Sequence, residues 1–310
     1  MFERTPSQEV VALLQDDIMG EHAAIVQYLR HAYSFPEGEF RAELEAIARE
    51  EMRHLEWLAE KVVELGGAPT LERGPAVFSG SLTELLAADV KAEEEAVALY
   101  RRHIAAIGQE EIRELLERII SDEEVHRQQF AKILEEAEAS GLAAASPQEA
   151  GIQPAGVAAT FLAQDVRHEY TAVLRYLHHS FTSSDCEASR SMEEKAIEEM
   201  KHLGWLAEKL ADQGGQPEME REAGTFAASE KELLAEEIAD EAKAINEYDQ
   251  QVEAVSDPWI KALLARISYH EKFHHKLLQR MKEEQAPTKL DVPSPDQRLT
   301  VGSLLGREHG

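Results

Sequence analysis

The chain has 310 residues, of which 43% are hydrophobic and 30% are charged, as is typical of a folded protein long enough for two domains. Its 32 Lys and Arg residues stand against 60 Asp and Glu residues, and the resulting net charge of −28 argues against a nucleic acid partner. The charge fits attraction of metal cations, but for most of these carboxylates it indicates a solvated, Glu-rich helix surface. The single cysteine excludes an intrachain disulfide and a rubredoxin-type iron site. The sequence contains neither a signal peptide nor an apolar run long enough to span a membrane, and we therefore expect a cytoplasmic protein.

Helical periodicity dominates the first half of the chain. It predicts helices over 8–35, 39–66, 80–107 and 109–139. Turn signals such as Phe35-Pro36-Glu37-Gly38 separate these helices. A stretch rich in Ala, Ser, Pro and Gly follows at 141–156 and predicts a linker. We therefore expect an all-α fold in which residues 1–140 form a four-helix bundle.

The same pattern starts again after the linker. The sequence EEMRHLEWLAEKVVELGGAP at 50–69 returns as EEMKHLGWLAEKLADQGGQP at 198–217, an offset of 148 residues without a gap. This repeat indicates a tandem duplication, with a second four-helix bundle over 157–285. Residues 286–310 have no helical period and predict a flexible spacer that ends in a short apolar stretch. Whether the two bundles pair within one chain or in a homodimer stays open.

Four Glu-x-x-His motifs carry the chemistry of the sequence. They are Glu51–His54, Glu123–His126, Glu199–His202 and Glu271–His274, in two pairs related by the same offset. Residues three apart on a helix share a face, so each motif presents a carboxylate and an imidazole together. Two such helices, with one Glu from each of two others, provide the ligands of a dimetal site in a four-helix bundle.

The duplication helps to select the remaining ligands. Glu93, Glu94 and Glu95 compete for one position, and their counterparts are Glu241, Ala242 and Lys243. Only Glu93 keeps its carboxylate in both copies. On the first helix of each half, Glu21 and Glu169 are preferred to the aspartates one turn earlier, because a longer side chain reaches the bundle axis more readily.

The expected metal ligands form two matching sets. In the first half, Glu21 and His54 are assigned to one metal and Glu93 and His126 to the other, with Glu51 and Glu123 bridging. In the second half the same roles fall to Glu169 and His202, to Glu241 and His274, and to the bridging Glu199 and Glu271. Hard oxygen ligands with one imidazole per metal suit iron or manganese, and both metals accept this ligand set equally well.

A few positions depart from the duplication or add to it. Asp122 becomes His270 and Asp89 becomes Glu237. We expect these groups to orient the ligand histidines, so that the two sites differ in affinity or rate. His31 and His179 are also paired at the offset, but no Glu lies three residues before them, and they are interpreted as helix-face histidines.

Each half resembles the ferritin-like superfamily, and bacterioferritin is the subfamily to which it is most similar. The resemblance rests on Glu21-x6-Tyr28, Glu51-Met52-Arg53-His54, Glu93 and Asp122-Glu123-Glu124-Val125-His126, and on their counterparts in the second half. It implies ferroxidase chemistry, in which two Fe(II) ions are oxidised by O2 or peroxide. It also implies that Tyr28 and Tyr176 lie near the metals and supply an electron, with ordinary core packing as the alternative.

The resemblance implies a haem as well. In bacterioferritin, methionines at the positions of Met52 and Met200 bind haem b from two sides across a subunit twofold. Here the two halves would supply both methionines within one chain. The alternative is ordinary packing of methionines on a helix face.

The sequence Arg298-Leu299-Thr300-Val301-Gly302-Ser303-Leu304-Leu305-Gly306 resembles the cargo-loading peptide of encapsulin systems. The resemblance implies that an encapsulin shell protein binds Leu299, Val301 and Leu304 in apolar pockets. The alternative is an apolar tail without a partner. The expected function is therefore a di-iron ferroxidase for iron storage inside an encapsulin compartment. The rivals are a dimetal peroxide scavenger with iron or manganese, and a non-catalytic haem- or metal-binding electron carrier.

Overall fold

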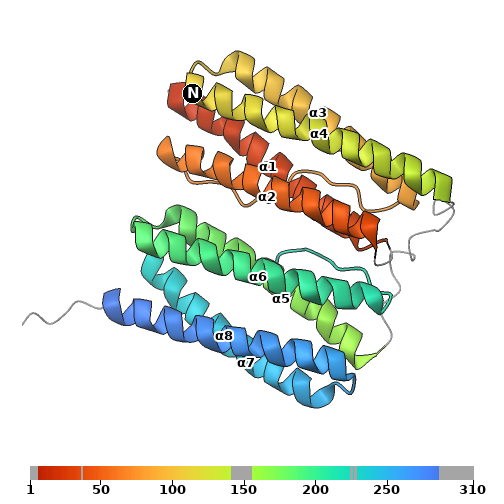
Figure 1. The fold of residues 1–310 in the computed structure, drawn as a ribbon. Coiled ribbons are helices and arrows are strands. Elements are labelled where there is room, and N and C mark those ends of the chain that lie inside the picture. The colour runs from red at the N-terminus through yellow and green to blue at the C-terminus, as the bar shows by residue number, and fades with distance from the viewer. Residues whose placement is uncertain (1–5, 36–37, 141–155, 224–225, 227–228, 286–310) are drawn as a thin grey trace, which may run out of the picture.

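The computed structural model describes residues 6–35, 38–140, 156–223, 226 and 229–285 (Figure 1). Every regular element in these ranges is an α helix, so the all-α prediction is confirmed. The helices are α1 (Pro6–Ala32), α2 (Glu39–Glu64), α3 (Leu82–Ala106), α4 (Glu110–Ser140), α5 (Val157–Thr182), α6 (Cys186–Asp212), α7 (Glu230–Ala254) and α8 (Pro258–Gln285). Within these described ranges no helix combines the length and the apolar character needed to cross a membrane.

The helices form two four-helix bundles, one from each half of the chain. In the first bundle α1 packs along α2 and α3 along α4, and the second bundle repeats this with α5, α6, α7 and α8. Figure 1 shows the bundles side by side, with α1 and α2 turned toward α5 and α6. The pairs α3–α4 and α7–α8 lie at opposite ends of the molecule.

Local signals fix the ends of the helices that carry the motifs. α3 begins with a capping box, in which Ser81 accepts from the Glu84 backbone and Glu84 accepts from the Ser81 backbone. α2 ends in a Schellman motif, with Gly66 at φ 76° and the Gly67 N–H donating to the Val62 carbonyl. The same motif ends α6 at the duplicated positions, so the repeated sequence stops both helices in the same way.

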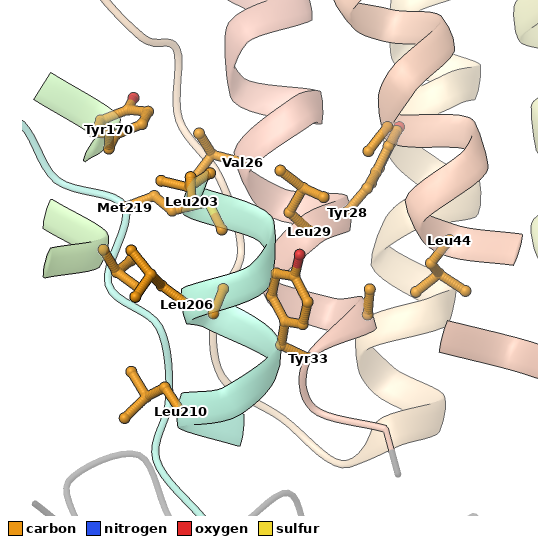
Figure 2. Packing of buried hydrophobic residues seen from close by; sticks show 14 of the residues in the cluster. Val26, Tyr28, Leu29, Tyr33, Leu44, Tyr170, Leu203, Leu206, Leu210 and Met219 are labelled. Atoms are coloured by element: carbon orange, nitrogen blue, oxygen red, sulfur yellow. The ribbon is translucent and has the colours of Figure 1, made fainter. Parts of the chain in front are cut away.

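One hydrophobic cluster extends through both bundles. Leu29 of α1 and Tyr33, which follows α1, belong to it, and so do Leu203, Leu206 and Leu210 of α6. Figure 2 shows Tyr33 beside α6, with the side chains of Leu206 and Leu210 on the other side of that helix. The two halves therefore pack on one another within a single chain, which the sequence left open.

His22 and Tyr170 locate the axis that relates the two halves. The Tyr170 hydroxyl lies 2.6 Å from His22 Nε2, and the two residues are separated by the repeat offset of 148. Duplicated positions contact each other only where they lie close to a twofold axis. The bundles are therefore arranged as a pseudo-symmetric dimer inside the chain.

Candidate dimetal centres

Six side chains from four helices meet inside the first bundle. They are Glu21 of α1, Glu51 and His54 of α2, Glu93 of α3, and Glu123 and His126 of α4. All six are buried. Their ligand atoms form two groups, in each of which all the atoms lie within 4.8 Å of one another. One group contains Glu21 and His54, the other contains Glu93 and His126, and Glu51 and Glu123 belong to both.

The second bundle repeats this arrangement. Glu169 of α5, Glu199 and His202 of α6, Glu241 of α7, and Glu271 and His274 of α8 are all buried. Glu199 and Glu271 are shared between two groups, one with Glu169 and His202 and one with Glu241 and His274. The structure thus brings together all twelve side chains that the sequence proposed as ligands, as two sets of six.

The histidines of the first centre direct Nδ1 into the cluster. His54 Nδ1 lies 2.8 Å from Glu51 and 3.2 Å from Glu123. His126 Nδ1 lies 2.8 Å from Glu51 and 3.0 Å from Glu123. Each Nδ1 therefore faces both shared carboxylates, at the place where a metal bound by all three groups would lie. Four carboxylates and two imidazoles are a donor set that fits two divalent iron or manganese ions.

The outer nitrogen of each histidine has its own partner. His126 Nε2 lies 2.8 Å from Glu50, and His274 Nε2 lies 2.5 Å from Glu198. These carboxylates fix the orientation of the rings. Neither glutamate was singled out in the sequence, although both occur at the repeat offset directly before a ligand.

The remaining two ligand histidines are oriented differently in the two centres. His54 Nε2 lies 3.5 Å from Asp122, whereas His202 Nε2 lies 2.9 Å from His270 Nδ1. This agrees with the role expected for Asp122 and His270.

The same expectation was wrong for Asp89 and Glu237, which do not orient the ligand histidines. Asp89 binds His31 at 2.7 Å and Glu237 binds His179 at 2.8 Å. Both histidines are completely buried, so they tie the first helix of each half to the third. His31 and His179 are related by the repeat offset, and so are Asp89 and Glu237, so the sequence contained a signal for this contact.

Protonation compensates for the buried charge of the metal-free clusters. Burial, with the neighbouring Glu123 and Glu51, raises the pKa of Glu21 well above its usual value. Burial opposes the charge of His54, but hydrogen bonds with Glu123 and Glu51 outweigh it and raise the pKa to about 12. Glu123 is also buried, yet His126 and His54 lower its pKa to about 2. Metal binding at such a site must release protons.

Four buried tyrosines contact the terminal glutamates. Tyr28 donates to Glu93 at 2.7 Å, and Tyr176 donates to its duplicate Glu241. The nearness of Tyr28 and Tyr176 to the clusters is therefore visible in the structure. Tyr100 donates to Glu21 and Tyr248 to Glu169, and this second pair was not predicted from the sequence. Tyr100 and Tyr248 are related by the repeat offset, and this recurrence could have identified them from the sequence.

The other predicted site residues lie outside these clusters. Met52 is partly buried against the hydrophobic cluster that both halves share, and Met200 is half-buried on α6. Haem binding by this pair stays a prediction, and a Soret band in protein from haem-replete cells is the measurement that tests it. The tail residues Leu299, Val301 and Leu304 lie outside the described residues.

Comparison with known proteins finds one family model twice in the chain. The model for the ferritin-like domain matches residues 11–140 and 159–283. A bacterioferritin of Desulfovibrio desulfuricans is 31% identical over 132 residues, which cover 40% of this chain and 74% of the relative. A bacterioferritin of Mycobacterium leprae is 30% identical over 127 residues, or 38% of this chain and 79% of the relative. A crystal structure of the D. desulfuricans bacterioferritin, described with a diiron site in different catalytic states, superposes with a TM-score of 0.42 at 27% identity and covers 46% of this chain and 91% of that one.

Proposed function

Because this chain belongs to the ferritin-like family, with two copies of its domain, we propose that each half binds two Fe(II) ions as substrate and oxidises them. The observation that carries the proposal is the pair of shared carboxylates in each cluster. Glu51 and Glu123 belong to both ligand groups of the first centre, as Glu199 and Glu271 do in the second. Two metals that share two carboxylates lie close enough together to act on one oxidant.

The side chains of each cluster hold the two ions and compensate their charge. Four carboxylates offset the four positive charges of two Fe(II) ions, so the buried site becomes neutral when it is filled. Two Fe(II) ions become two Fe(III) ions and supply two electrons, which with two protons reduce O2 to hydrogen peroxide or hydrogen peroxide to two water molecules. Tyr28 and Tyr176 each donate a hydrogen bond to a terminal glutamate, and this contact supports their role as electron donors beside the centres.

Anaerobic Fe(II) titration tests the proposal. One ion for each of the four ligand groups is expected, hence four per chain. The double variant Glu51→Ala/Glu199→Ala removes one shared carboxylate from each centre and should abolish fast oxidation. Its matched control is Glu60→Ala/Glu208→Ala, which changes glutamates of the same two helices at the repeat offset, outside the clusters. Retained oxidation in the first variant would reject the site.

The oxidant and the metal separate this function from its closest rival. A ferroxidase of the storage type is expected to consume O2 with Fe(II), whereas a peroxide scavenger turns over peroxide with iron or manganese. Rates measured with each oxidant on the iron-loaded and the manganese-loaded protein distinguish the two. Rapid peroxide turnover without net Fe(II) oxidation would favour the scavenger.

We further propose that the protein is cargo of an encapsulin compartment, which would contain the mineral that its centres produce. The support is the sequence of residues 298–306, since these residues lie outside the described part of the structure. Co-expression with an encapsulin shell protein tests this proposal. Deletion of residues 299–310 should abolish loading, and unchanged loading would contradict the cargo role.

A further inference from the structure

The surroundings of the second centre carry more basic side chains than those of the first. At four positions related by the repeat offset the second half gains a basic group, namely Gly20 to His168, Gln27 to Arg175, Ile47 to Lys195 and Asp122 to His270. In the other direction, Asp240 replaces Ala92 and forms an ion pair with Arg175, and the buried His103 of the first half becomes the neutral Gln251. The six ligands themselves are the same in both halves.

Lys195 is the most consequential of these changes because its side chain is buried. It is 3% exposed and lies on α6 one turn before the shared ligand Glu199, on the same face. Burial lowers the pKa of Lys195, and the nearby carboxylates of Glu241, Glu198, Glu199 and Glu237 oppose this lowering. Lys195 therefore brings a buried basic side chain close to the carboxylates of the second centre. Its counterpart Ile47, 4% exposed, gives the first centre a hydrocarbon at this place.

Arg175 and His168 add to this difference. Both line a small cavity that reaches the ligands Glu169 and Glu241. In the first half the counterpart of Arg175 is Gln27, which donates to Asp89 at 2.9 Å and carries no charge. The cavity beside the second centre is thus lined by two basic groups that have no basic counterpart in the first half.

We propose that Lys195 weakens the binding of divalent cations at the second centre, so that the first centre fills first. The inference rests on the proposed function, in which both clusters bind metal. A buried ammonium group within a nanometre of a divalent cation changes its binding constant by about tenfold or more. One chain would then hold a tight centre and a weak centre built from identical ligands.

Anaerobic titration of the full chain with Co(II), followed by its visible absorption and by calorimetry, tests the proposal. The wild type should show two classes of sites that differ by about tenfold or more in affinity. Lys195→Ile, which installs the residue of the first half, should raise the affinity of the weaker class of sites toward that of the tighter class. Lys195→Met should do the same and keeps the length of the side chain.

The reciprocal variants identify the centres. Ile47→Lys should weaken the tight class, and Glu51→Ala should leave only the weak class. A single class of sites in the wild type, or unchanged binding in both Lys195 variants, would overturn the proposal. No Co(II) binding at all would instead reject the proposed metal centres, so the two failures are distinct.

A separate observation concerns the exposed face of α8. Trp259, Tyr269 and Phe273 are 80%, 73% and 56% exposed, and their spacing places them on one side of the helix. Their counterparts on α4 are Glu111, Ser121 and Val125, so this aromatic face is a feature of the second half alone.

The two helices also differ in charge. α8 has six Lys and Arg residues against three Glu residues, whereas α4 has four Lys and Arg residues against ten Asp and Glu residues. In a chain with a net charge of −28, α8 is a basic and aromatic surface and α4 an acidic one. They lie at opposite ends of the molecule (Figure 1).

We infer that α8 of one copy binds α4 of a second copy, in a head-to-tail contact. Charge complementarity selects this pairing, because α8 on α8 would place basic groups together and α4 on α4 acidic ones. The aromatic side chains would supply the apolar part of the interface. A head-to-tail contact repeats from copy to copy and gives a ring or an open filament.

Sedimentation velocity over a range of protein concentrations tests this surface. Self-association is expected at low salt and should weaken as salt rises. Trp259→Glu/Tyr269→Ser/Phe273→Val, which installs the residues of α4, should leave a monomer, as should Glu114→Lys/Glu117→Lys on the acidic side. A monomeric wild type at every concentration would overturn the inference. So would a wild type whose association survives both variants.

Discussion

Asp17 and Asp165 occupy duplicated buried positions but have different partners. Asp17 accepts from His103 at 2.8 Å, whereas Asp165 accepts from the neutral Gln251 at 2.8 Å. Burial raises the pKa of Asp165 to about 7, and the hydrogen bond from Gln251 only partly opposes this. The second half therefore contains a buried carboxyl group without a cationic partner.

This difference predicts the effect of Asp165→Asn on the metal-free protein. The folded state keeps a proton on Asp165 up to a pH of about 7, whereas the unfolded chain loses it near 3.8. Stability therefore falls as pH rises through this window, and above it the ionised group costs up to about 4 kcal/mol. Asp165→Asn should stabilise the protein at pH 8 and change little at pH 4, measured by urea unfolding.

Asp17→Asn is the matched control, because it removes the anion that faces His103. Burial also raises the pKa of Asp17, but His103 opposes this, so we expect a smaller stabilisation from Asp17→Asn at pH 8. An equal effect of Asp165→Asn at pH 4 and pH 8 would contradict the assignment of the titrating group.

Glu50 supports a second prediction at the scale of single residues. Its carboxylate holds His126 Nε2 at 2.8 Å, so Glu50→Gln weakens the group that orients this ligand. Metal affinity at the first centre should fall about tenfold. Metal titration checks this, with Glu198→Gln as the matched variant of the second centre. Equal loss at both centres from Glu50→Gln alone would contradict it.

The helices are the part of the molecule that the sequence predicts best. Their apolar periodicity and Gly or Pro stop signals place the second helix at 39–66, and the structure has α2 at Glu39–Glu64. The first helix was predicted to 35 but ends at Ala32, because the last residues before Pro36 turn away from the helix. The Glu and His residues that recur at the repeat offset of 148 likewise identified the members of each cluster.

Ser81 leads to a prediction at the scale of a helix. It caps α3, the helix that carries Glu93, and accepts from the Glu84 N–H. Ser81→Ala leaves this N–H without a partner and should lower the free energy of unfolding by about 1 kcal/mol. Urea unfolding measures the loss, and Ser229→Ala, at the duplicated cap of α7, should cost a similar amount. A loss in neither variant would show that these caps do not stabilise the bundles.

Relations between the halves lie beyond what helix patterns predict. Periodicity marks an apolar face but not which helix covers it, so the contact between α2 and α5 did not follow from the sequence. The burial of Lys195 was missed for the same reason, because a lysine in a Glu-rich helix is usually exposed. Only the three-dimensional packing turns such positions toward the interior.

The shared core predicts that the two halves unfold together. Tyr33, which follows α1, is buried in the shared cluster and lies beside α6 of the other half (Figure 2). Tyr33→Ala should cost about 3–5 kcal/mol and weaken the contact between the halves, so that one calorimetric transition becomes two. Leu58 is completely buried but belongs to a cluster centred on the first bundle. Leu58→Ala should also destabilise the protein, but without separating the halves, and two transitions already present in the wild type would contradict the shared core.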